Sequence, residues 1–151
     1  DVDSQLFNST VYDEIAFGPR QLGLTEEEVS QRVQDTLSLL KIEDLRDRVP
    51  YQLSGGEKKK VAFASIMVTN PDVYILDEPF NNLSKEYEEF FRELLHDLHS
   101  AGKTIIMSAH HFKHLHHEKA DVLLFEDGKA DFFPVQEVLS NQQVVERLSH
   151  Y

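Results

Sequence analysis

Two adjacent carboxylates follow an apolar run near the middle of the chain. Residues Val73–Leu76 read Val-Tyr-Ile-Leu, and Asp77 and Glu78 come directly after them. In an α/β sheet, ligands bind outside the carboxyl ends of the strands, so the pattern predicts both side chains at a binding edge. One carboxylate can hold a hydrated Mg2+ while its neighbour polarises an attacking water. Taken alone, the pattern also fits a solvated strand end without chemistry.

A second candidate site is the segment Leu53–Glu57, which reads Leu-Ser-Gly-Gly-Glu before a helical pattern. Gly55 and Gly56 allow a ligand to approach the backbone, and the helix that follows offers free N–H groups and a positive dipole end. Ser54 adds a hydroxyl donor. The segment therefore predicts an anion site suited to phosphate, with a simple serine-capped turn as the alternative.

A third candidate is a cluster of histidines near residue 110. If this segment is helical, His110 shares a face with both His114 and His117, which makes a Ni2+ or Zn2+ site geometrically possible. The alternative is a solvated helix with one mechanistic histidine, His110. The cluster consists of His110, His111, His114, His116 and His117.

The elements before residue 70 are predicted to be helical. A short helix over about 11–17 is expected to end at Gly18-Pro19, a pair that breaks helices. Thr25 and Glu28 have the spacing of a capping box, followed by apolar residues on one helical face. That face carries Val29, Val33, Leu37 and Leu40.

After residue 70 the pattern alternates between strands and helices, which indicates a parallel α/β sheet. Asp127-Gly128 is typical of a hairpin turn. We therefore expect two domains, a helical one over 1–70 and an α/β one over 71–151. The expected strands are 73–76, 104–109, 122–125 and 129–133, and the expected helices are 84–101 and 135–148.

Composition excludes several classes of protein. The 151 residues carry 15 Lys and Arg against 27 Asp and Glu, a net charge of −12, which argues against a nucleic-acid partner bound by bulk electrostatics. There is no cysteine, so disulfides, thiol catalysis and cysteine-ligated metals are excluded. The longest apolar runs are far shorter than the roughly 20 residues that span a bilayer.

Four segments together resemble the ABC-type ATPases, in the family's order and over essentially the whole chain. Leu53–Glu57 matches the family's signature motif at all five positions, and Tyr74–Pro79 is similar to the Walker B strand with its catalytic glutamate. Thr104–His110 resembles the strand that leads into the switch histidine, and Asp121–Lys129 resembles the strand and turn that follow. The resemblance implies a P-loop NTPase fold: a helical signature subdomain and the C-terminal half of a RecA-like core.

The resemblance also implies roles, with ATP and Mg2+ as cofactors. Asp77 would bind Mg2+ through water, Glu78 would be the general base and His110 the γ-phosphate sensor, which favours the mechanistic histidine over a metal cluster. The D-loop position falls on Ser84. The residues that would reach ATP held by a partner subunit are Leu53, Ser54, Gly55, Gly56 and Glu57.

The implied partners are a second ABC ATPase subunit, identical or paralogous and paired head to tail, and an integral membrane subunit. The membrane subunit would dock on the helical subdomain and hold the protein at the cytoplasmic face of the membrane. Ser4–Phe7 and Thr10–Pro19 resemble the cobalt/nickel and energy-coupling-factor importers, which take up metal ions or vitamins. The alternatives are an importer of another substrate, a soluble ABC ATPase of translation or DNA repair, and a truncated module that binds a partner without catalysis.

Departures from the family pattern qualify these expectations. No Gly-x-x-x-x-Gly-Lys-Ser/Thr loop is present: in Gly102-Lys103-Thr104 the required earlier glycine is Asp97, so we expect Gly102 to cap a helix instead. The chain thus resembles a nucleotide-binding domain whose first half has been removed, and we expect it to be inactive alone. Phe80 stands where the family usually has Thr, and Ser84 where it usually has Asp.

Overall fold

A computed structural model describes residues 6–109 and 120–148. The chain forms two compact units, one of residues 1–74 and 82–105 and the other of residues 75–81 and 106–151. The boundary between these units passes through two strands, so it does not test the expected division into 1–70 and 71–151, which stays a prediction. No helix in the described part of the chain is long and apolar enough to cross a membrane.

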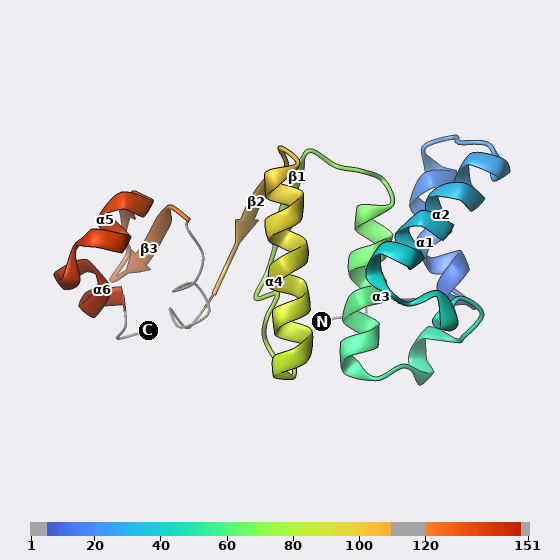
Figure 1. Ribbon diagram of the computed structural model, residues 1–151, viewed down its shortest axis with the longest axis horizontal. Helices are drawn as coiled ribbons and strands as arrows, with labels where there is room; N and C mark the ends of the chain where they lie inside the picture. The colour runs from blue at the N-terminus through green and yellow to red at the C-terminus, as the bar shows by residue number, and fades with distance from the viewer. Residues whose placement is uncertain (1–5, 110–119, 149–151) are drawn as a thin grey trace. The chain divides into compact units, whose positions relative to one another are not determined.

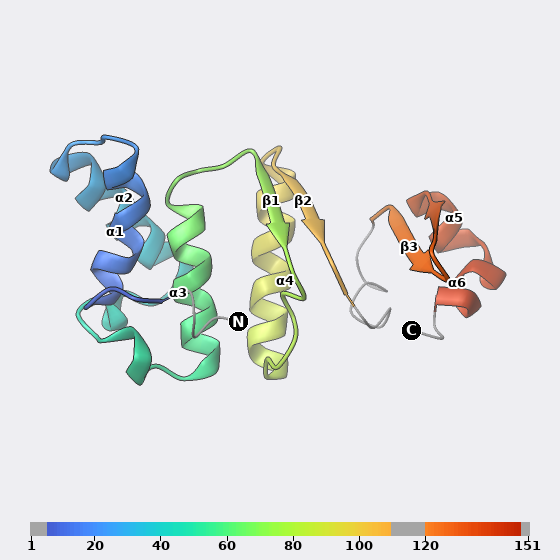
Figure 2. The same ribbon diagram turned by 180° about the vertical axis from the view of Figure 1, so that it is seen from behind.

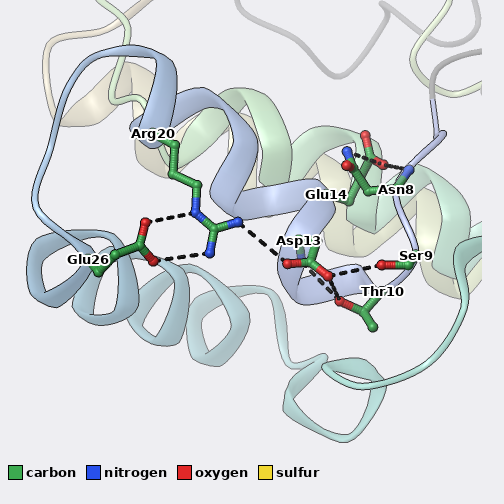
Figure 3. A network of polar contacts seen from close by, with 7 residues as sticks. All are labelled: Asn8, Ser9, Thr10, Asp13, Glu14, Arg20 and Glu26. Atoms are coloured by element: carbon green, nitrogen blue, oxygen red, sulfur yellow. Dashed lines mark hydrogen bonds and ion pairs between the residues drawn. The ribbon is translucent and has the colours of Figure 1, made fainter.

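The first unit begins with α1 (Val11–Gln21), which a polar network anchors at its start. The Thr10 hydroxyl caps the helix by accepting the Asp13 N–H at 3.1 Å. Asp13 also contacts Arg20, whose guanidinium donates two hydrogen bonds to Glu26 of the next helix (Figure 3). On the same helix, the buried Glu14 carboxylate accepts the Asn8 N–H at 2.8 Å, so the segment that precedes α1 is bonded to the helix.

The predicted end of this first helix at Gly18-Pro19 is wrong, because α1 continues through both residues to Gln21. Pro19 is fully buried, and the helical hydrogen bonds resume beyond it with the Leu22 N–H bonded to the Gly18 carbonyl. A Cβ on Gly18 would lie 2.8 Å from the Thr69 side chain. Gly18 therefore provides close approach between segments, and packing outweighs the breaker tendency of the pair.

The next helix, α2 (Glu26–Leu40), confirms the capping box predicted from Thr25 and Glu28, since both reciprocal hydrogen bonds are present. Its predicted apolar face is fully buried, together with Val11 and Ile15 of α1 and Val61 of α3. Figure 1 shows α1, α2 and α3 (Gly55–Met67) packed against one another. Two short 3-10 turns, Glu43–Leu45 and Pro50–Gln52, connect α2 to α3.

Strands β1 (Val73–Leu76) and β2 (Thr104–Met107) pair side by side (Figure 2). The Thr104 N–H bonds to the Asp72 carbonyl at 2.9 Å, and the Ser108 N–H bonds to the Leu76 carbonyl at 3.0 Å. Both strands advance in the same direction along these bonds, so the pair is parallel, as the alternation of elements predicts.

Helix α4 (Lys85–Ser100) connects the two strands and ends as predicted near Gly102. Gly102 has a φ of +90°, and its N–H bonds to the His99 carbonyl at 2.9 Å. The Lys103 N–H bonds to the Leu98 carbonyl at 3.0 Å, which completes a Schellman cap. Gly102-Lys103-Thr104 is thus a helix terminus that leads into a strand.

In the second unit β3 (Val122–Glu126) and β4 (Lys129–Phe133) form an antiparallel hairpin. Asp127 and Gly128 have φ values of +49° and +73°, the positive angles that the predicted two-residue turn requires. The single helix predicted over 135–148 is wrong: α5 (Val135–Ser140) and α6 (Gln142–Leu148) are separate. They separate at Asn141, whose side chain accepts the Gln143 N–H at 3.0 Å and starts a new helix.

Candidate functional site

The signature segment forms the start of α3 in the first unit. The Ser54 hydroxyl accepts the Glu57 N–H, and the Glu57 carboxylate accepts the Ser54 N–H at 2.8 Å, so a capping box is formed. This backbone hydrogen bond from Ser54 lowers the pKa of Glu57. The N–H groups of Gly55 and Gly56 lie in the first turn, where a helix offers no carbonyl to accept them. The geometry therefore suits an anion as well as a simple cap.

The two signature glycines have different surroundings. A Cβ on Gly56 would lie 2.8 Å from ring atoms of Tyr87 on α4, whereas a Cβ on Gly55 would meet nothing within 4 Å. Lys60 of α3 also contacts the aromatic rings of α4. Its ammonium lies 5.4 Å from the Tyr87 ring centroid and 4.0 Å from that of Phe90. Burial lowers the pKa of Lys60. Packing against α4 thus requires Gly56, while Gly55 faces open space.

We predict that Gly56→Ala makes the protein about 1–3 kcal/mol less stable, because Tyr87 must leave its place over α3. Gly55→Ala, the matched control, should leave stability unchanged or raise it by up to about 1 kcal/mol, because alanine loses less conformational entropy on folding. Urea denaturation measures both. Equal stability of the two variants would contradict the packing role of Gly56, and a Tyr87→Ala change should restore part of the stability lost in Gly56→Ala.

The carboxylate pair lies in the second unit, at the carboxyl ends of the parallel strands. Ser108, directly after β2, contacts both residues: its hydroxyl donates to Asp77 Oδ1 and accepts the Glu78 N–H at 3.0 Å. The Asn81 side chain donates to Glu78 Oε2. Glu78 has a φ of +45°, an unusual angle for a residue that is neither Gly, Asn nor Asp. The carboxylates are therefore held at fixed positions.

This arrangement fits the chemistry expected of a hydrated magnesium ion. Among residues 6–109 and 120–148 no group of three or more His, Asp or Glu side chains gathers as a complete metal cage. Mg2+ retains several waters and commonly uses only one or two carboxylates together with substrate phosphates. An acidic pair such as Asp77 and Glu78 is therefore compatible with a hydrated Mg2+ held partly by other groups.

The remaining predicted positions are Ser84 and Phe80, which the structure describes, and the histidine cluster, which it does not. The Ser84 hydroxyl accepts the Tyr87 N–H at 3.5 Å and caps α4, and Phe80 is buried. His110 and the rest of the histidine cluster lie outside the described residues. Sequence reasoning missed Ser108 and Asn81. The available signal for Ser108 was a hydroxyl near the end of the predicted strand 104–109.

A profile of the family described as ABC transporter matches residues 2–81, more than half of the chain. The chain belongs to the ABC transporter family. The resemblance to its ATP-binding proteins of the cobalt, nickel and energy-coupling-factor types is confirmed by relatives that carry these names.

Three relatives show how far this ABC transporter chain extends. It is 54% identical over 111 residues to the nickel import ATP-binding protein LarO of Lactiplantibacillus plantarum, covering 74% of this chain and 46% of that protein. It is 46% identical over 110 residues to the cobalt import ATP-binding protein CbiO of Rhodobacter capsulatus, covering 73% and 39%. It is 35% identical over 147 residues to the energy-coupling factor transporter ATP-binding protein EcfA of Carboxydothermus hydrogenoformans, covering 97% and 54%. The chain spans about half the length of these relatives.

Solved structures agree with the P-loop NTPase fold of an ABC ATPase. CbiO1 from Clostridium perfringens, part of the ABC transporter complex CbiONQ, superposes with a TM-score of 0.81 at 32% identity. The superposition covers 97% of this ABC transporter chain and 59% of that chain.

Proposed function

We propose that this chain belongs to the ATP-binding and ATP-hydrolysing subunit of an importer of the cobalt/nickel or energy-coupling-factor type. The observation that carries the proposal is the pair Asp77 and Glu78, held by Ser108 at the carboxyl end of a parallel strand pair. A parallel strand end is where α/β proteins bind ligands, and adjacent carboxylates suit metal-assisted hydrolysis. The substrates named for the relatives, nickel and cobalt, supply the class of cargo.

Each residue of the site has a proposed task in hydrolysis. Glu78 accepts the proton of the attacking water. Asp77 would hold a water of a hydrated Mg2+, which when bound would supply positive charge beside the phosphate oxygens. The first turn of α3, with Ser54, Gly55 and Gly56, presents N–H and hydroxyl donors to ATP bound by a second subunit. His110 senses the γ-phosphate, and Ser84 lies at the D-loop position.

The proposed assembly has two further parts. A second ATPase subunit pairs head to tail with this one, so that each signature helix meets the nucleotide of the other. An integral membrane subunit docks on the helical segment before residue 70, which holds the protein at the cytoplasmic face of the membrane. The importer-like segment Thr10–Pro19 favours this assembly over a soluble ATPase of translation or DNA repair and over a non-catalytic module.

We predict that the complete protein, purified in mild detergent after expression with its neighbouring genes, retains a polytopic membrane subunit. Phe17 of the importer-like segment forms an exposed edge-to-face pair with Phe7, with ring centroids 5.6 Å apart. Phe17→Asp should therefore reduce the membrane subunit recovered, because a charge replaces apolar contact surface. Phe132→Asp on β4, a change at an exposed aromatic side chain outside the segment before residue 70, is the control.

Mass spectrometry of the purified material checks this prediction. Recovery with ribosomes or DNA instead of a membrane protein would support the soluble alternative. Recovery of neither, with no ATPase activity in the complete protein, would support the non-catalytic module.

A further inference from the structure

One hydroxyl connects the two residues to which hydrolysis is assigned. Ser108 lies 31 positions after Asp77 and 30 after Glu78. Its Oγ–H donates to the Asp77 carboxylate while its oxygen accepts the Glu78 backbone N–H at 3.0 Å. A serine hydroxyl has one hydrogen to donate and two lone pairs to accept with, so both contacts form at the same time.

The backbone of Ser108 is itself fixed. Its N–H bonds to the Leu76 carbonyl at 3.0 Å, which is part of the parallel pairing of β1 and β2. The hydroxyl is therefore carried by a paired strand end and does not depend on a loop for its position. A hydrogen bond from such a rigid element can set the direction of a neighbouring side chain.

Glu78 needs such a contact because of its backbone conformation. Its φ of +45° is unfavourable for a residue with a long side chain, and without support the turn would relax toward a negative φ. That relaxation would swing the carboxylate away from its present direction. The hydrogen bond from the Glu78 N–H to Ser108 fixes the peptide before Glu78. The Asn81 N–H bonds to the Glu78 carbonyl at 3.1 Å and fixes the peptide after it, so a rotation about φ would break one of these two bonds.

Asp77 is held by the hydrogen bond that the Ser108 hydroxyl donates. The hydrogen bond from Ser108 to Oδ1 restricts rotation of the carboxylate, so the second oxygen takes a defined direction for a water of the metal ion. Mutating the hydrogen-bonded partners that orient metal-binding groups typically costs about 10–100-fold in metal affinity or activity.

We infer that Ser108 is a positioning residue that sets the direction of both Asp77 and Glu78 through one hydroxyl. The inference rests on the proposed function, because it assigns Ser108 a task in the hydrolysis that those two residues perform. Ser108 touches neither the nucleotide nor the attacking water in this role. It acts through the Asp77 carboxylate and the Glu78 backbone.

The test compares variants at this position in the complete ATPase. Ser108→Ala should lower kcat and raise the Mg2+ concentration for half-maximal activity, with a combined loss of about 10–100-fold. Ser108→Thr keeps the hydroxyl and should retain most of the activity. Ser100→Ala, which removes an exposed hydroxyl at the end of α4, is the matched control and should behave as wild type. A readout other than activity is the Mg2+ affinity of the ATP-bound protein, measured by titration calorimetry in a Glu78→Gln background without turnover. Ser108→Ala should lower this affinity and Ser100→Ala should not.

The outcomes separate this inference from the proposed function. If the complete wild-type protein hydrolyses no ATP, the proposed function is wrong. If Glu78→Gln abolishes hydrolysis but Ser108→Ala has the wild-type kcat and Mg2+ dependence, the positioning role is wrong. Should Ser108→Ala fail to fold, Ser108→Cys tests the positioning role instead. A thiol has a similar shape but is a weak hydrogen-bond donor, so this variant should hydrolyse ATP slowly. A Ser108→Cys variant with full activity at low Mg2+ would overturn the inference.

Discussion

Glu78→Gln in the complete protein is expected to lower kcat for ATP hydrolysis by about 10²–10⁴-fold, the usual contribution of a general base. ATP binding should persist, because the glutamine has the shape of the glutamate and its amide oxygen can accept the hydrogen bond from Asn81. The amide cannot accept a proton from the attacking water, so the nucleotide should stay bound without turnover. Phosphate release and equilibrium binding of ATP measure the two effects separately.

The matched control for this substitution is Glu93→Gln on α4, which makes the same chemical change at an exposed position. It should leave both hydrolysis and binding unchanged. Full hydrolysis in Glu78→Gln would assign the base to another group. Loss of binding and hydrolysis together would mean that Glu78 supports the structure of the site and would contradict its role as a base.

The second large effect concerns the 151 residues expressed by themselves, which are expected to show no measurable ATP hydrolysis. They contain no Gly-x-x-x-x-Gly-Lys-Ser/Thr loop, and the one similar segment is the helix terminus at Gly102. Phosphoryl transfer depends almost entirely on holding the β- and γ-phosphates in position. Asp77 and Glu78 would then lack a substrate at the correct distance. Steady-state phosphate release with Mg2+ and ATP measures the outcome.

A complementation experiment sharpens this second prediction. Joining the chain to an upstream half with a phosphate loop should restore turnover, and the same fusion carrying Glu78→Gln should stay inactive. The upstream half alone is the control for contaminating ATPases. Magnesium-dependent hydrolysis by the 151-residue chain that disappears in Glu78→Gln would show that the phosphates are held by residues of this chain, contrary to the prediction.

The sequence determined the features that depend on short-range patterns. The capping boxes of α2 and α3 use side chains three residues apart, so Thr25 with Glu28 and Ser54 with Glu57 identify both helix starts. The Asp127-Gly128 turn and the Gly102 cap are likewise encoded by residues that tolerate a positive φ. The family itself follows from short motifs in a fixed order, which needs no knowledge of contacts between distant residues.

Two helix boundaries were predicted wrongly because a contact in the folded chain outweighed the local sequence pattern. Gly18-Pro19 is typical of a helix break, yet the burial of Pro19 and the close approach of Gly18 to Thr69 keep α1 intact. The tail after residue 134 has continuous helical periodicity, yet the Asn141 side chain bonds to the Gln143 N–H and divides it. In each case a contact that the periodicity does not encode decided the helix boundary.

The contacts that support the site depend on how distant segments of the chain pack together. Gly56 and Tyr87 are far apart in the sequence, and their contact depends on how α3 packs against α4. Ser108 meets Asp77 and Glu78 because β1 and β2 pair in one register, and a shift of one residue would turn its hydroxyl to the other face of the sheet. Motifs determine which residues can do the chemistry, whereas strand register and helix packing determine which neighbours hold them in place. These long-range contacts leave no periodic signal in a single sequence.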